Sequence, residues 1–378
     1  MITQTNHRET FRFVPSTSTP VSPERVAQLL KAEWELFTKQ TGKSAEESKR
    51  ALKSLPMGVT SSFQHWDPYP ISIVSAKGAW MTDVDGRQLL DLSMGFGAML
   101  AGHLNPVIVE EVKKALESGT LFVTPSPIST DAAERICRRF GIDLVRFTNS
   151  GTESTMYAVR TARAATDKNA IVKIEGGYHG SYDPFVVSSK PPIDKIGDAE
   201  DPIAYTPEGI VPGEIYVVPY NNADALERTF KKHGSSIACF ILEPVLENLG
   251  IILPDEGYLE RVRELCDEYN VVLIFDEVKT GLTAGHQGAS QRLSVTPDLI
   301  TLAKSIGGGL PLAAFGGKKK YMDYVTNGKM AHFGTFNGNP LAMAGVRAID
   351  RLCSDQALAD AEALNQQALD RISEIIDE

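Results

Sequence analysis

Three apolar stretches of this sequence are each followed directly by residues that could carry chemistry. These residues are the acid Asp276, the lysine Lys304 and the triplet Ser150-Gly151-Thr152. Parallel α/β sheets bind their ligands at the carboxyl ends of their strands. The sequence therefore predicts an acid, an amine and an anion-binding site at one edge of a sheet.

The triplet Ser150-Gly151-Thr152 stands at the start of a predicted helix. The first N–H groups of a helix have no partner within it, and the helix dipole places about half a positive charge at that end. A phosphate would bind there, and the two hydroxyl groups would add donors. The alternative is an ordinary helix cap, because Ser and Thr are favoured in that position. The triplet is not a Walker loop, since the sequence contains no GxxxxGK[ST] motif.

Lys304 ends an apolar strand and precedes the glycines Gly307-Gly308-Gly309. Apolar surroundings lower the pKa of a lysine, so that the neutral amine can form an imine with an aldehyde. Consecutive glycines indicate that a bulky group approaches the backbone. Asp276 closes the most apolar strand, where a carboxylate needs a cationic partner. The alternatives are a solvated lysine and, for the acid, a helix cap or a structural ion pair.

Together these three features are the parts needed to hold pyridoxal 5'-phosphate. The acid would keep the ring nitrogen protonated, so that the ring accepts electrons, and the lysine would carry the aldehyde and then move protons. A metal site is not indicated, because the four cysteines are scattered and form no CxxC pair.

The elements that must position these residues alternate between helix and strand beyond Gly102. Strands are predicted over 144–148, 171–174, 215–218, 237–242, 271–275 and 299–303. Strands with helices between them predict an α/β fold with a largely parallel, buried sheet. The predicted domains are an N-terminal arm and helix over 1–70, a large cofactor-binding domain over 71–330 and the start of a small C-terminal domain over 331–378. The proline-rich segment 188–213 is expected to be a surface loop or lid.

Composition excludes several classes of protein. The chain has 378 residues, of which 42% are hydrophobic and 23% charged, as in globular proteins. Its formal net charge of −10 argues against nucleic-acid binding, which needs basic patches. No stretch approaches the length of about 18 apolar residues that a membrane span needs. The polar first twenty residues show no secretory signal, and the scattered cysteines favour a cytoplasmic enzyme.

With these residues in place, the sequence resembles the class III, fold-type I pyridoxal-phosphate aminotransferases. It is especially similar to the branch that includes glutamate-1-semialdehyde aminomutase and β-amino-acid aminotransferases. The resemblance runs from about Pro56 to about Asp350 and rests on many motifs in order. The motifs are Asn149-Ser150-Gly151-Thr152-Glu153, Gly177-Tyr178-His179-Gly180, Glu243-Pro244, Asp276-Glu277-Val278, Pro297-Asp298-Leu299, Lys304-Ser305-Ile306-Gly307-Gly308-Gly309 and Gly334-Thr335-Phe336-Asn337-Gly338-Asn339-Pro340.

The resemblance implies a role for each matching residue. Lys304 would hold the aldehyde as an imine and act as the base, and Asp276 would pair with the ring nitrogen. Phosphate binding is implied for Ser150, Gly151 and Thr152, joined by Thr335 from the neighbouring subunit of a homodimer. The cofactor ring would lie between Tyr178 and Val278, since stacking fixes its tilt. Glu243 would lie behind the residues that contact the cofactor and help to hold them in place, and His179 is expected to be structural.

Departures from the family pattern concern the substrate. The aminomutases carry an arginine for the substrate carboxylate where this sequence has Gln64, and β-phenylalanine-type enzymes carry one where it has Ser61. Losing either guanidinium removes a bidentate partner for a carboxylate. Aromatic residues instead surround these positions, namely Phe63, His65, Trp66 and Tyr69. They predict a more aromatic substrate pocket, unless they only pack the seam between domains.

Lys279 is a second lysine close to the predicted site, where relatives more often have Gln or Met. Lys304 remains the better candidate for the imine, because it alone ends a strand and precedes three glycines. The sequence also ends several tens of residues earlier than family members usually do. The small C-terminal domain is therefore expected to be truncated or reduced.

The leading prediction is a pyridoxal-phosphate aminotransferase that moves an amino group between an amino acid or amine donor and an oxo acceptor in two half-reactions. The alternative is glutamate-1-semialdehyde 2,1-aminomutase, in which the transfer is intramolecular. A weakly catalytic cofactor-binding or scaffold protein is a third possibility, suggested by the short C-terminus. A nucleotide-binding protein is disfavoured, since no GxGxxG follows an early strand.

Overall fold

The computed structural model of the protein describes residues 22–197 and 203–377. The chain forms two compact units. One comprises the residues up to Ala76 together with Trp80–Leu90, and the other comprises Lys77–Ala79 together with the residues from Asp91 onward. The predicted N-terminal arm, and part of the predicted surface loop, lie outside the described residues. The three-part division at residues 70 and 330 remains a prediction.

The first unit contains helices and a small sheet. Its elements are α1 (Pro23–Gln40), α2 (Gly42–Ala51), the 3-10 helices η1 (Pro56–Gly58) and η2 (Ser62–Gln64), β1 (Ile73–Lys77), β2 (Trp80–Asp83) and β3 (Gln88–Leu90). The strands lie in the order β1-β2-β3, and β2 pairs with β3 in antiparallel fashion. Asp85, in the turn between them, accepts hydrogen bonds from the backbone N–H of Lys43 and the hydroxyl of Ser44, each at 2.7 Å. These bonds fasten α2 to the turn.

The second unit contains a seven-stranded sheet and the helices around it. Its strands are β4 (Leu144–Thr148), β5 (Ala170–Ile174), β6 (Ile215–Val218), β7 (Ile237–Leu242), β8 (Val272–Glu277), β9 (Leu299–Leu302) and β10 (Ala313–Gly317). Its helices are α3 (Pro106–Ser118), α4 (Pro127–Phe140), α5 (Gly151–Thr166), α6 (Asp183–Val186), η3 (Ile193–Lys195), α7 (Ala223–His233), η4 (Glu247–Leu249), α8 (Tyr258–Glu268), α9 (Thr280–Thr283), α10 (Gly288–Arg292), η5 (Lys304–Gly307), α11 (Lys319–Thr326), α12 (Pro340–Leu352) and α13 (Asp355–Asp377).

The order of the strands in the large sheet is β4-β10-β9-β8-β7-β5-β6. Strands β5 to β9 pair in parallel, whereas β10 is antiparallel to both β4 and β9. Strand β4 therefore runs in the same direction as β9, and the carboxyl ends of β4 to β9 meet at one edge. The prediction of an α/β fold with a largely parallel sheet is confirmed. Strand β10 was not among the predicted strands, because Ala313–Gly317 is a short run that ends in two glycines.

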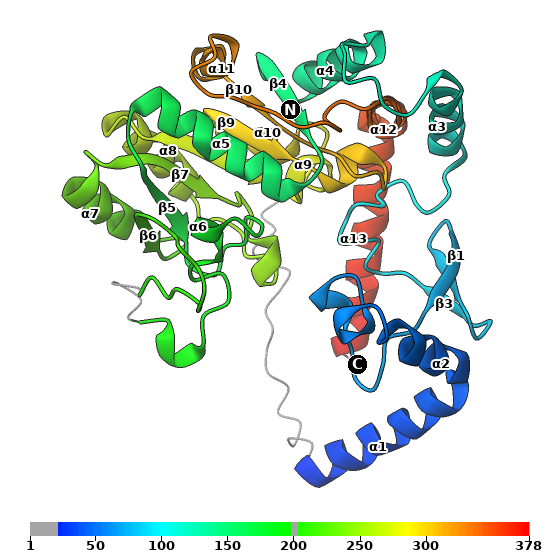
Figure 1. Ribbon diagram of the computed structural model, residues 1–378. Coiled ribbons are helices and arrows are strands. Elements are labelled where there is room, and N and C mark those ends of the chain that lie inside the picture. Colours follow the sequence, from blue (N-terminus) through cyan, green and yellow to red (C-terminus); the bar gives the residue numbers. More distant parts are fainter. Residues whose placement is uncertain (1–21, 198–202, 378) are drawn as a thin grey trace. The chain divides into compact units, whose positions relative to one another are not determined.

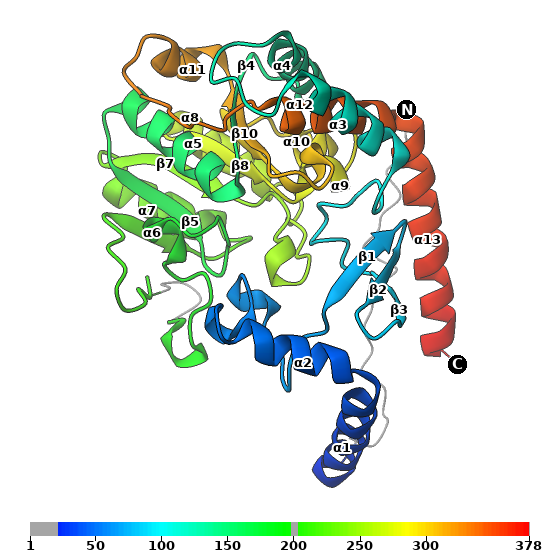
Figure 2. The ribbon, with the colours of Figure 1, turned by 45° about the vertical axis from the view of Figure 1, so that its right-hand side comes forward.

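Both faces of the large sheet are covered by helices, which explains why its strands are apolar on both sides. Helix α5 packs across one face, against β4, β7, β8, β9 and β10, whereas α7 contacts β6 and α8 contacts β8 (Figure 1). Alternate residues of β8 serve the two faces. Val272 and Ile274 belong to the core beneath α5, and Leu273 and Phe275 belong to the larger core that includes residues of α7 and α8. Figure 2 shows the same layers after a turn of 45°.

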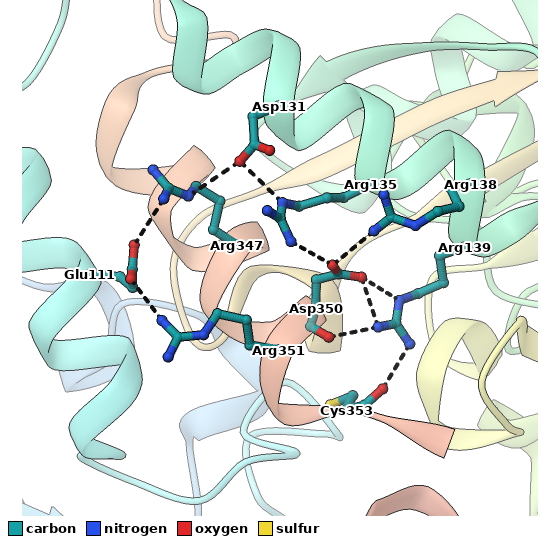
Figure 3. A network of polar contacts seen from close by, with 9 residues as sticks. All are labelled: Glu111, Asp131, Arg135, Arg138, Arg139, Arg347, Asp350, Arg351 and Cys353. Atoms are coloured by element: carbon teal, nitrogen blue, oxygen red, sulfur yellow. Dashed lines mark hydrogen bonds and ion pairs between the residues drawn. The ribbon is translucent and has the colours of Figure 1, made fainter. Parts of the chain in front are cut away.

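Helix α12 packs against α3 and α4, which precede it by some two hundred residues in the chain. A polar network joins the three helices (Figure 3). At its centre, Asp350 on α12 accepts hydrogen bonds from Arg135, Arg138 and Arg139 on α4. This network holds α3, α4 and α12 together beside the sheet.

Candidate active site

A cavity of about 280 Å³ lies at the carboxyl edge of the large sheet. Its size is close to the lower end of the range of roughly 300–1,000 Å³ found for small-molecule sites. Its wall is formed mainly by residues that directly follow strands. The lining residues are Asn149, Ser150, Gly151, Thr152, Thr155, Tyr178, His179, Gly180, Glu243, Asn248, Asp276, Val278, Lys279, Ala303, Lys304, Leu310, Pro311 and Leu312.

The start of α5 forms one wall of the cavity. Ser150 is the residue that caps this helix, and its hydroxyl accepts a hydrogen bond from the backbone N–H of Glu153 at 3.3 Å. The hydroxyl of Thr152 accepts a hydrogen bond from the N–H of Ser181 at 3.1 Å, which ties the loop after β5 to the helix. The remaining free N–H groups of the first turn, together with the helix dipole, make this end of the cavity suited to an anion.

Gly180 is required where that loop crosses the helix. Its backbone has a φ of 99°, and a β-carbon placed on it would lie 2.8 Å from the Cα atom of Thr152. A second close approach occurs on the other side of the helix start. A methyl group on Gly151 would lie 3.2 Å from both methyl groups of Val278. The two glycines therefore allow the loop and the end of β8 to close on the anion site.

Asp276 lies near the end of β8, is 4% exposed and has several hydrogen-bond donors around it. Nδ1 of His179 donates to its Oδ2 at 2.7 Å. The backbone N–H of Val278 (3.0 Å) and the hydroxyl of Thr301 (3.2 Å) donate to its Oδ1. These three bonds fix the orientation of the carboxylate in the wall of the cavity. Their donors also stabilise its negative charge.

Lys304 follows β9 and begins the short helix η5. Its backbone has a φ of 50°, in the left-handed region that residues other than glycine rarely adopt. Burial lowers the pKa of Lys304; the carboxylate of Asp276 opposes this change, and the ammonium group of Lys279 adds to it. A lysine whose pKa is lowered in this way has a larger fraction of the nucleophilic neutral amine.

Glu243 follows β7 and connects two parts of the wall. Its Oε1 accepts a hydrogen bond from the backbone N–H of Tyr178 at 3.1 Å, and its Oε2 accepts one from the side-chain amide of Asn248 at 2.8 Å. Burial raises the pKa of Glu243. The side chain thus holds Tyr178 at the rim of the cavity, where this residue is 43% exposed.

The structure brings together all but one of the residues predicted for the site. Ser150, Gly151, Thr152, Tyr178, Glu243, Asp276, Val278 and Lys304 all line the cavity. Thr335 does not line it and is exposed. The cofactor-binding roles of these residues remain predictions.

Sequence reasoning did not single out several residues of the site. Asn248 and Thr301 orient the two acids, yet neither belongs to the strand-end residues on which the prediction rested. Thr301 is paired in register with Asp276, so the order of the strands would have found it. His179 was expected to be structural, and the structure places it in the wall with its Nδ1 on Asp276.

Comparison with known proteins identifies the class of this fold. An omega-transaminase from Sphaerobacter thermophilus is 35% identical, with a TM-score of 0.80 over 83% of this chain and 73% of that one. A transaminase with PLP bound is 34% identical, with a TM-score of 0.78 over 84% and 74% of the two chains. The large unit is thus the α/β scaffold of the fold-type I transaminases.

The sequence comparisons are more specific. The glutamate-1-semialdehyde 2,1-aminomutase of Methanocorpusculum labreanum is 42% identical over 304 residues, which are 80% of this chain and 73% of that protein. The model of the class-III aminotransferase family matches residues 62–378. The chain belongs to the class III aminotransferases and is therefore a pyridoxal-phosphate-dependent enzyme, as predicted. No helix in the described part of the chain is both long and apolar enough to cross a membrane.

The cavity fits this cofactor. One end offers the free N–H groups and hydroxyl groups of a helix start, at which two glycines leave room for a close approach. A compensated carboxylate and an amine with a lowered pKa lie in the same cavity. The helix start supplies donors for a phosphate, the carboxylate an acceptor for a protonated ring nitrogen, and the amine a nucleophile for an aldehyde carbon.

Proposed function

We propose that the protein transfers an amino group between neighbouring carbon atoms of one substrate, as a glutamate-1-semialdehyde 2,1-aminomutase. The convergence of Lys304, Asp276 and the start of α5 on one cavity carries the chemical part of this proposal. The similarity to the aminomutase of M. labreanum supports the intramolecular reaction over transfer between two molecules. The alternative function predicted from the sequence is thus better supported than the leading one.

In this proposal the residues of the cavity divide the work. Ser150, Gly151 and Thr152 would bind the phosphate group through backbone N–H and hydroxyl donors. Asp276, held by His179, would keep a proton on the ring nitrogen. When bound, pyridoxal phosphate supplies the electron-accepting ring.

Lys304 would bind the aldehyde carbon through Nζ. Once displaced by the amino group of the substrate, the same nitrogen would accept the proton that leaves the carbon bearing that amino group, and would return a proton later in the reaction. Val278, beside Gly151, would pack on one face of the ring, and Tyr178 at the rim would pack on the other. Glu243 would hold Tyr178 in that place through its backbone N–H.

The experiment uses purified, cofactor-loaded protein and glutamate-1-semialdehyde alone. We expect turnover with no second substrate. NMR would detect it as the movement of a ¹⁵N-labelled amino group within the molecule. A requirement for an added amino donor and oxo acceptor would overturn the intramolecular proposal. It would leave the class of enzyme unchanged.

That second outcome would favour an intermolecular aminotransferase, which two observations support. Gln64 stands where the aminomutases carry a substrate-binding arginine, and its Oε1 accepts hydrogen bonds from the N–H and hydroxyl of Thr60. The omega-transaminase of S. thermophilus also matches this fold with a TM-score of 0.80. A screen of amines and amino acids with several oxo acids would identify such an activity.

We further propose that the enzyme works as a homodimer in the cytoplasm, with Thr335 reaching the phosphate site of the partner. Thr335 is exposed and lies outside the cavity of its own chain, and its neighbour Phe333 is 81% exposed. Light scattering would give the oligomeric state. Mixed dimers of Thr335→Ala and Lys304→Ala chains would show whether one intact site forms from two subunits.

A further inference from the structure

Lys279 has a position in the cavity that the proposed chemistry does not use. It follows Val278 directly and caps the short helix α9. Its side chain is half-buried and lines the cavity together with Lys304. The question is what an additional ammonium group does there.

Among the residues that line the cavity, Lys279 and Lys304 are the two that carry ammonium groups, and none is an arginine. Lys304 is committed to the cofactor in the proposed reaction. In the described part of the chain, Nζ of Lys279 forms neither a hydrogen bond nor an ion pair. An ammonium group that is partly withdrawn from water without a counter-ion is unfavourable.

The acids nearby are engaged with other partners. Asp276 accepts hydrogen bonds from His179, Val278 and Thr301, and Glu243 accepts from Tyr178 and Asn248. Neither acid forms an ion pair with Lys279 among the described residues.

Glu247 is the remaining acid close to Lys279. Its Oε1 accepts a hydrogen bond from the hydroxyl of Thr283 at 3.4 Å. Burial raises the pKa of Glu247, and the charge of Lys279 acts in the opposite direction. The charges of the two side chains therefore interact, but the side chains do not form an ion pair. A ligand can still bind directly to the ammonium group of Lys279.

We propose that Lys279 binds a carboxylate group of the substrate and so makes the site selective for amino acids over simple amines. The helix start at Ser150 provides a separate place for the phosphate, so that the two anions need not compete. The assignment also supplies the cation that Gln64 and Ser61 do not. It deepens the proposed function and rests on it, because it names the class of substrate of the same cavity.

The test compares Lys279→Gln and Lys279→Arg with the control Lys232→Gln, an exposed lysine on α7. The first readout is the dissociation constant of glutarate, an unreactive dicarboxylate, measured by calorimetry on the cofactor-loaded enzyme. Loss of a charged hydrogen bond predicts a rise of roughly 10- to 100-fold in Lys279→Gln. Lys279→Arg and Lys232→Gln should stay close to the wild type, and the dissociation constant of pyridoxal phosphate should not change.

The second readout is the ratio of kcat/KM for glutamate-1-semialdehyde to that for 2-aminopentanal, in which a methyl group replaces the carboxylate. Lys279→Gln should lower this ratio by a similar factor. The proposal is overturned if Lys279→Gln lowers kcat/KM equally for both substrates, if its affinity for the cofactor falls instead, or if Glu247→Gln reproduces the effects of Lys279→Gln. Wild-type protein that binds glutarate through Lys279 but converts no amino compound would support this inference and refute the proposed function.

Discussion

Lys304 combines a lowered pKa with a strained backbone, and both properties can be tested by replacing it. Alanine should lower kcat by roughly 10²- to 10⁴-fold, because the residue that moves the proton is lost. The free energy of unfolding of Lys304→Gly should exceed that of Lys304→Ala by about 1 kcal/mol. Glycine alone removes the cost of the left-handed conformation at this position, where φ is 50°. Thermal unfolding of the two variants measures this difference.

A control identifies which of the two lysines in the cavity holds the cofactor. Borohydride reduction of the loaded enzyme, followed by peptide mass spectrometry, should place the pyridoxyl group on Lys304. An adduct on Lys279, or equal thermal stability of the alanine and glycine variants, would contradict this account of Lys304.

Asp276 is the other residue whose charge the chemistry needs. Asp276→Asn keeps nearly the same shape and can still accept from the N–H of Val278. It loses the negative charge, so that the ring nitrogen would no longer stay protonated. We expect kcat to fall by about 10²-fold or more, with a much smaller change in the affinity for pyridoxal phosphate. Steady-state kinetics and a cofactor titration separate the two effects, and an unchanged kcat would contradict the role assigned to this carboxylate.

At the level of elements, the loop after β5 must lie directly on the start of α5. Gly180→Ala would place a methyl group against Thr152, at a φ of 99°. Gly209→Ala is a matched control, since φ is 77° there and nothing lies within 4 Å of the added methyl. We expect about 1–3 kcal/mol of destabilisation at Gly180 and clearly less at Gly209. Only the first should weaken cofactor binding; equal effects would show that backbone strain alone is responsible.

Strand β5 contains Lys173, a lysine that is fully buried. Its Nζ donates to the carbonyl groups of Phe185 (3.2 Å) and Val187 (2.6 Å), which fastens α6 to the sheet. Burial lowers the pKa of Lys173 to about 7. In the unfolded chain a lysine titrates near 10.4, so between these values only the unfolded state holds the proton. Stability should therefore rise with pH across this window, by up to about 1.4 kcal/mol per pH unit.

Lys173→Met removes this titration while keeping an unbranched side chain. The difference in free energy of unfolding between wild type and variant, measured in urea from pH 7 to 10, should grow in favour of the wild type. Lys232→Met on α7 serves as the control, because its side chain is exposed. A difference that does not change with pH would show that Lys173 is charged in both states.

The sequence predicts a strand or helix well where burial of apolar side chains alone determines the element. The apolar runs before Asp276 and Lys304 could be assigned as strands, although β8 extends through Asp276 to Glu277 and β9 ends at Leu302, one residue before its predicted end. Strand β10 could not, since two of its five residues are glycine and its place depends on pairing with β4 and β9. Thr301 and Asn248 were missed for the same reason: their contacts arise from strand order and not from local pattern.

At the scale of the whole large unit, polar contacts join helices that are distant in the chain. Glu111 on α3 pairs with Arg351 of α12, and Asp131 on α4 pairs with Arg347 of α12 (Figure 3). Asp350 is the most connected acid of this network. Burial acts to raise its pKa, but the hydrogen bonds and charges of the α4 arginines outweigh this and hold it below the ordinary value.

Asp350→Asn should therefore destabilise the protein in a pH-dependent manner. An aspartate whose pKa is lowered by folding contributes stability above its unfolded value of about 3.9, and loses it as the pH falls through the folded value. At pH 7 we expect a loss of about 1–3 kcal/mol, since Arg135, Arg138 and Arg139 each lose a charged partner. Arg138→Ala is the control: its side chain is 65% exposed and should contribute less than about 1 kcal/mol. Urea unfolding at pH 7 and at a series of lower pH values measures both variants, and the difference between wild type and Asp350→Asn should shrink as the pH falls below the unfolded value. A difference that does not shrink would mean that packing at position 350, and not its charge, holds α4 against α12.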